Sequence, residues 1–139
     1  MSVWTHVAGV IRIDAIRFDP NDTPDFDAIF GREWTFDDMW DDEPAYTDSI
    51  ENPDNFMPSG SEGSLEKSIW INPDRSSMAS YVVTIFGDLR DYYNSENIIK
   101  WFKSCCEKVW VRQAVITVQT EGREPVVYNY TKNGGEDNV

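Results

Sequence analysis

The sequence predicts an α+β protein built as one domain. Residues 3–17 alternate apolar and polar side chains, which is the period of a strand with one buried face. Residues 96–107 instead repeat apolar side chains at the spacing of an amphipathic helix. The chain has 139 residues, of which 40% are hydrophobic, and this is enough for one folded core. We expect the domain to span residues 1–131, with a polar, frayed tail at 132–139.

A short helix is expected after the first strand. Thr23 can cap its N-terminus, Pro24 suits its first position, and Gly31 supplies the left-handed backbone that ends a helix. The side chains expected on the inner face of this helix are Phe26, Ile29 and Phe30.

Two strands at 65–71 and 80–87 are expected to form an antiparallel hairpin. The residues that connect them, Asn72 to Ser77, are rich in turn formers. Asn94 or Ser95 can then cap the amphipathic helix that follows.

Strands at 109–120 and 125–131 complete the order β-α-β-β-α-β, with one extra C-terminal strand. This order is the ferredoxin-like plan, in which two helices cover one face of an antiparallel sheet. On that plan residues 32–64 form a long acidic loop extension between the first helix and the second strand. A loop of this length inside a compact domain is typical of a functional or a disordered segment.

The net charge of the protein is concentrated in one stretch, Phe18–Gly63, which we call the acidic segment. It holds fourteen acidic residues and one basic residue, Arg32, whereas the rest of the chain holds eleven of each. The segment therefore carries the whole net charge of -13. Eight aromatic residues run through it: Phe18, Phe26, Phe30, Trp34, Phe36, Trp40, Tyr46 and Phe56. These aromatic residues indicate a packed segment, because solvated, disordered tails contain few aromatic residues.

This charge predicts the class of partner. A strongly negative surface repels nucleic acid and anionic membranes and attracts basic proteins. Residues 1–10 lack the pattern of a signal peptide, and no apolar run reaches the ~20 residues of a membrane span. We therefore expect a cytoplasmic protein that binds neither nucleic acid nor a membrane directly.

Few residues point to catalysis or to a cofactor. His6 is the single histidine, and its place on the polar side of a strand is typical of a surface residue. Cys105 and Cys106 are adjacent on a helix, so a disulfide between them is disfavoured and burial as small apolar residues is expected. No phosphate-binding motif or zinc-ligand spacing is present, so we expect no enzyme activity, no metal and no cofactor.

The acidic segment supports two interpretations. In one, its acids only solvate an irregular loop. In the other, they form a negative array that copies the charge of nucleic-acid phosphates and occupies a basic groove on another protein, with aromatic residues as contact anchors. The residues assigned to that partner-binding surface are Trp34, Asp37, Asp38, Trp40, Asp41, Asp42, Glu43 and Tyr46.

A second hypothesis is a small-ligand site. Glycine and serine in the loop 59–64 would let a backbone approach a small molecule, and Arg90 is able to pair with a phosphate or carboxylate. The residues assigned to this alternative site are Ser59, Ser61, Ser64, Asp88, Arg90 and Asp91. A flexible linker at 59–64 and a strand-to-helix turn at 88–91 explain the same residues without a ligand.

The stretch Ser68–Tyr92, with its Gly-Asp-Leu-Arg-Asp run, resembles small proteins encoded by bacteriophages. That resemblance implies a setting in which small acidic proteins block a host defence, either by capping a nucleic-acid-binding effector or by sequestering a nucleotide-derived signal. We therefore expect a non-enzymatic inhibitor of a basic host protein, with a nucleotide-like ligand as the alternative and an enzyme as the third option. The sequence leaves two oligomeric states open. Val126, Tyr128 and Tyr130 either pair across the axis of a homo-oligomer or complete the sheet of a monomer.

Overall fold

The computed structural model describes residues 2–16, 22–37, 43–72 and 78–131, with only the backbone at 43–46 and 78. Within this part of the chain, five antiparallel strands form one sheet in the order β4-β5-β1-β6-β7. The strands are β1 (Trp4–Ile16), β4 (Glu66–Ile71), β5 (Met78–Arg90), β6 (Trp110–Thr120) and β7 (Val126–Tyr130). The predicted α+β class is confirmed. The predicted tail at 132–139 and most of the turn at 72–77 lie outside the described residues.

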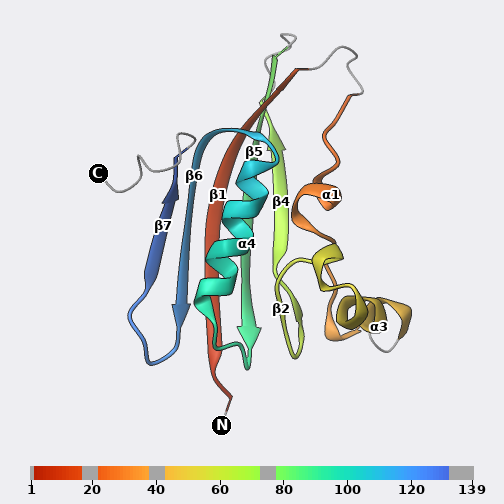
Figure 1. Ribbon diagram of the computed structural model, residues 1–139, viewed down its shortest axis with the longest axis vertical. Helices are drawn as coiled ribbons and strands as arrows, with labels where there is room; N and C mark the ends of the chain where they lie inside the picture. The colour runs from red at the N-terminus through yellow and green to blue at the C-terminus, as the bar shows by residue number, and fades with distance from the viewer. Residues whose placement is uncertain (1, 17–21, 38–42, 73–77, 132–139) are drawn as a thin grey trace.

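The described helices lie on one side of the sheet or beside its β4 edge. Helix α4 (Ser95–Glu107) crosses the front of the sheet, while α1 (Phe26–Phe30) and α3 (Glu43–Glu51) lie beyond β4 (Figure 1). The 3-10 turn η1 (Pro53–Asn55) and the two-residue strands β2 (Ser59–Gly60) and β3 (Gly63–Ser64) follow α3. None of the described helices has the length and apolar composition that crossing a membrane requires.

Strand β1 shows why the sheet has one covered face and one open face. Its side chains alternate, so that Val7, Ile11 and Ile13 are buried beneath the helices, whereas His6 and Val10 are exposed on the opposite side. The register shifts between Arg12 and Ile13, where the pairing with β6 has a bulge.

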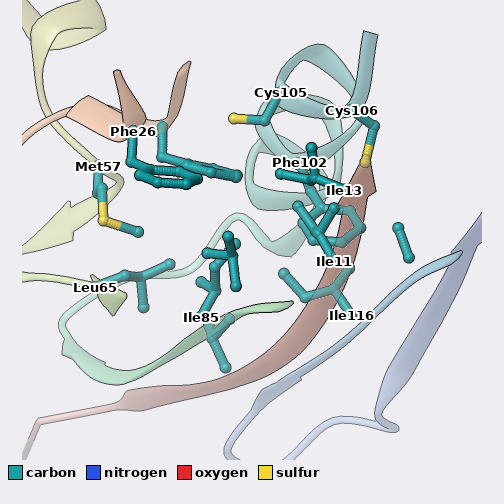
Figure 2. Packing of buried hydrophobic residues seen from close by; sticks show 14 of the residues in the cluster. Ile11, Ile13, Phe26, Met57, Leu65, Ile85, Phe102, Cys105, Cys106 and Ile116 are labelled. Carbon is teal, nitrogen blue, oxygen red and sulfur yellow. The ribbon is translucent and has the colours of Figure 1, made fainter. Parts of the chain in front are cut away.

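The core fills the space between the covered face and the helices. Figure 2 shows Phe102, Cys105 and Cys106 of α4 above Ile11, Ile13 and Ile116 of the sheet. Phe26 and Met57, both from the acidic segment, lie on the same core beside Leu65 and Ile85. The expected burial of both cysteines is confirmed, since each is 1% exposed.

The helix ends follow the predicted chemistry with one correction. Asp25 caps α1, its carboxylate accepting from the backbone N–H of Ala28 at 3.1 Å, so Thr23 and Pro24 precede the helix instead of starting it. Gly31 ends α1 with a φ of 96°, as expected. Asn94 caps α4, accepting from the N–H of Asn97 at 3.3 Å.

Strand β5 is longer than predicted. The strand was predicted to end at Gly87 and a turn to follow at 88–91, but Asp88 pairs with His6 of β1 and the strand continues to Arg90. The cross-strand partner decides this outcome, and it lies about eighty residues away in the chain. Strand β7 completes the sheet at the edge beyond β6.

Candidate functional site

Backbone hydrogen bonds join two distant parts of the acidic segment to each other. The N–H of Arg32 donates to the carbonyl of Asn55, and the N–H of Met57 donates to the carbonyl of Arg32, each at 2.9 Å. Arg32 and Phe56 thereby form a parallel bridge. Phe56 and Met57 are buried. Residues 32 and 57, the two ends of the intervening stretch, are therefore held together next to the core.

Trp34 belongs to this anchoring and is not an exposed contact residue. It is 4% exposed. Its backbone N–H donates to the Ser64 hydroxyl at 2.9 Å, and its backbone carbonyl accepts from the Ser64 N–H at 2.9 Å. The prediction that Trp34 offers its side chain to a partner is therefore wrong in this conformation. Among the described aromatic residues of the acidic segment, Phe36 is exposed, at 39%.

Lys67 ties the start of the segment to strand β4. Its side chain is 5% exposed, and its ammonium donates to Asp27 at 2.8 Å, to Glu33 at 3.1 Å and to the carbonyl of Gly31 at 3.0 Å. One cation therefore holds both sides of the turn that ends α1.

Other carboxylates of the segment are partly or largely exposed. Asp48 pairs with Arg32 at 2.7 Å, and Glu62 lies 3.5 Å from Arg90. The exposed acids that have no cationic partner among the residues that the structure describes include Asp37, Glu51 and Asp54. The arrangement presents fixed negative charge on a packed support.

Most of the predicted partner-binding residues cannot be placed in detail. Asp38, Trp40, Asp41 and Asp42 lie outside the described residues. Glu43 and Tyr46 belong to α3, but their side chains also lie outside the described part.

The loop at 59–64 is a tight hairpin and not a flexible linker. Strands β2 and β3 pair within it, and the N–H of Ser61 donates to the carbonyl of Arg90 at 3.1 Å. A Cβ at Gly60 would lie 2.5 Å from that carbonyl oxygen, so only glycine allows the hairpin to sit this close to β5.

The structure brings together half of the predicted ligand residues. The Ser61 hydroxyl donates to the Asp91 carboxylate at 3.4 Å, and Arg90 lies 3.9 Å from the same carboxylate. Ser64 instead bonds Trp34, Ser59 pairs with Ser64 in the hairpin, and Asp88 bonds His6. The six predicted residues do not form one site, because Ser64 and Asp88 bond partners other than Ser61, Arg90 and Asp91.

A cleft that the sequence did not predict opens between the acidic segment and α4. It has a volume of about 590 Å³, within the range of small-molecule pockets. Its aromatic lining comes from Phe30, Phe56, Tyr92 and Trp101, and its polar lining includes Asp54, Asn97, Ser104 and Lys108. Residues 97, 101, 104 and 108 follow helical spacing, so this second stripe of α4 was a signal for the cleft in the sequence.

The cleft is built from contacts between α1 and α4. The indole N–H of Trp101 donates to the carbonyl of Phe30 at 3.3 Å, and their rings lie 6.4 Å apart between centroids. Lys108 donates to the carbonyl of Ile29 at 3.3 Å. Burial raises the pKa of the Tyr92 phenol, which is protonated at neutral pH in any case, so its hydroxyl is able to donate a hydrogen bond.

His6 lies at one end of the open face between two carboxylates. Its Nδ1 is 2.6 Å from Asp88 and its Nε2 is 3.3 Å from Glu121. The hydrogen bond with Asp88 is the main reason that the pKa of the imidazole is raised; partial burial opposes the shift and Glu121 adds to it. Across the described residues, no three of the His, Cys, Asp and Glu side chains are grouped to hold a metal ion.

Comparison with protein-family models, curated proteins and solved structures finds no match to this chain.

Proposed function

We propose that this protein is a non-enzymatic binding protein that inhibits a basic, nucleic-acid-binding host protein through the carboxylates of its acidic segment. The observation that carries the proposal is that the described parts of this segment are packed and bonded to the body. Trp34, Phe56 and Met57 are buried, Lys67 pairs with Asp27 and Glu33, and the Ser64 N–H donates to the Trp34 carbonyl.

A fixed array binds better than a mobile one. A basic groove holds phosphates at set spacings, and an acidic surface that copies this charge competes for it. Carboxylates on a mobile chain would lose conformational entropy on binding, whereas carboxylates on a packed segment have already lost it during folding. Asp37, Glu51 and Asp54 are exposed on this support, and the neutral remainder of the chain directs a basic partner to the segment.

The fold and setting form part of the same proposal. The strand order β4-β5-β1-β6, with α1 and α4 in the connections, agrees with a ferredoxin-like plan extended by β7. The bacteriophage resemblance of residues 68–92 favours a bacterial cytoplasm as the compartment and a host defence factor as the target.

Competition with DNA tests this proposal. The protein is immobilised, and basic proteins from a bacterial extract are captured at low salt, at high salt and with added double-stranded DNA. The proposal expects a bound protein that is released by DNA and whose affinity falls steeply with salt, because exposed charges are screened within ~3 Å at 1 M ionic strength. Capture that persists at 1 M salt, or that DNA does not reduce, would contradict it.

The cleft beside α4 favours a second candidate, a small nucleotide-like ligand. Aromatic rings accept a planar base by stacking, Asn97 and Ser104 provide hydrogen bonds, and Lys108 provides a positive charge. A thermal shift with a nucleotide panel, and mass spectrometry of ligand released from denatured protein, test this candidate. A shift that is lost in Trp101→Ala supports it; no shift with any nucleotide and no released compound would rule it out.

A further inference from the structure

The open face of the sheet carries apolar side chains that no described helix covers. The strand register aligns them in neighbouring rows: Phe86 pairs with Ala8, Thr84 with Val10, and Val82 with Trp70. Val10 and Phe86 are each 38% exposed and Trp70 is 52% exposed. On the far strand, Val127 is 58% exposed and pairs with Thr117 on the same face.

Charged residues lie at the two ends of this face. Asp88 and Glu121 lie at the end marked by His6, and Glu66 is one row further in. Arg12 and Arg112 lie toward the other end, where Arg112 donates to Asp14. The centre is therefore apolar, one end is mainly acidic, and the other end carries the arginines.

The charge pattern decides what the face binds. Its described residues include two arginines and four carboxylates, so this part of the face is not basic enough to bind nucleic acid or an anionic membrane. A basic partner is directed to the acidic segment instead, which carries the whole net charge. A second copy of the same face is complementary when it is turned end to end, because its arginines then meet the first copy's acids.

The size of the face suits a dimer. Five strands spaced ~4.8 Å apart are about 24 Å wide, and the nine residues from His6 to Asp14 are about 30 Å long at ~3.4 Å per residue. The projected area is about 700 Å², which is close to the ~800 Å² that each partner buries in a stable interface.

We propose that two copies of this chain pack face to face through the open sides of their sheets. The two-fold axis runs across the strands at the level of Val10 and Thr84, so these residues face their own copies. Arg12 of one copy then lies over the row of Ala8 and Phe86 in the other copy, next to the row that holds His6 and Asp88. This inference does not rest on the function of the acidic segment.

Sedimentation equilibrium of the full chain tests the interface. The monomer has a mass of 16.0 kDa, and the wild type is expected to show twice this mass at about 100 µM, where a Kd of 1 µM would pair most chains. Val10→Glu and Thr84→Glu each place two like charges at the axis and should raise the dimer Kd more than about 100-fold. The control is Ile50→Glu, because Ile50 is 60% exposed on α3, away from the sheet face, and this variant should remain dimeric.

A charge exchange tests the direction of packing. Arg12→Glu should weaken the dimer, and adding Asp88→Arg should restore much of the lost affinity. Circular dichroism checks that each variant is folded. If Val10→Glu fails to fold, Thr84→Glu still tests the axis, because Thr84 is at an exposed strand position. A monomeric wild type, or dimers unaffected by both axis variants, would overturn the proposal; failure of the exchange to restore affinity would overturn the assigned axis.

Discussion

The ammonium of Lys67 lies 2.8 Å from the carboxylate of Asp27, and the lysine side chain is almost completely buried while the aspartate is exposed. The same ammonium also bonds Glu33 and the carbonyl of Gly31. Lysine is seldom buried without such partners. The Lys67 side chain therefore attaches the turn that ends α1, at residues 27–33, to the sheet.

Replacing that side chain should loosen the segment. Lys67→Met keeps the apolar stem but leaves Asp27 and Glu33 near each other with no cation between them, so we expect unfolding free energy to fall by about 1–3 kcal/mol. Urea unfolding measures this loss, and limited proteolysis should show earlier cleavage within residues 32–64. Lys103→Met is the matched control, because Lys103 is exposed on α4. Equal stability of the two variants would show that Lys67 does not anchor the segment.

Gly31 should be sensitive to a single methyl group. A Cβ there would lie 2.5 Å from the carbonyl carbon of Phe56, and φ is 96°. We expect Gly31→Ala to cost about 3 kcal/mol or more, because it combines backbone strain with displacement of the backbone at Phe56 and Met57. Gly122→Ala is the control, since Gly122 also has a positive φ, of 83°, but nothing within 4 Å of its Cβ position. Chemical denaturation gives the loss in unfolding free energy for each variant, and the difference between the two losses measures the effect of the close approach to Phe56. Equal losses would contradict a tight contact at Gly31.

His6 should titrate above its ordinary pKa. Because it is the single histidine in the sequence, its ring protons can be followed by NMR without assignment. The folded-state pKa is raised, mainly by Asp88, so this interaction stabilises the fold fully below the unfolded pKa of ~6.5 and is lost as pH rises through the folded pKa. Asp88→Asn should move the titration toward lower pH. A midpoint that does not change in this variant would show that Asp88 is not the cause.

Cys105 and Cys106 should be unreactive in the native protein. Burial raises the pKa of each thiol to about 12, and each side chain is 1% exposed. Thiolate is the nucleophilic form, so alkylation at pH 8 should be very slow until denaturant is added. Counting thiols with a chromogenic disulfide reagent, with and without denaturant, checks this expectation. Rapid labelling of either cysteine in the folded state would mean that α4 opens readily.

The elements that sequence reasoning predicted well are those whose signal is local and periodic. The alternation in β1 and the apolar stripe of α4 each report one buried face, so their positions were correct within two residues. The cap of α1 was assigned to Thr23 because both Thr23 and Asp25 are capping residues, and only the structure shows which one accepts from Ala28.

The features that sequence reasoning missed depend on distant partners. Trp34 was assigned to the surface with the acids around it, but Ser64, thirty residues away, bonds its backbone at a buried position. Asp88 was grouped with Arg90 because they are close in sequence, whereas cross-strand pairing places it beside His6. The cleft combines residues 53–58 with one face of α4; helical spacing marks that face of α4, but it does not report that residues 53–58 pack against it.

The central claim is tested most directly by comparing two variants with equal charge. The first changes Asp37, Asp38, Asp41 and Asp42 to Asn within the acidic segment; the second changes four exposed acids of the neutral body to Gln, namely Glu66, Glu96, Glu107 and Glu124. Both lose four negative charges, so nonspecific attraction changes equally. Affinity for the DNA-displaceable basic partner, measured by calorimetry, should be abolished in the first variant and retained in the second, with both still folded. Equal affinity in the two variants would contradict the claim that the acidic segment is the binding surface.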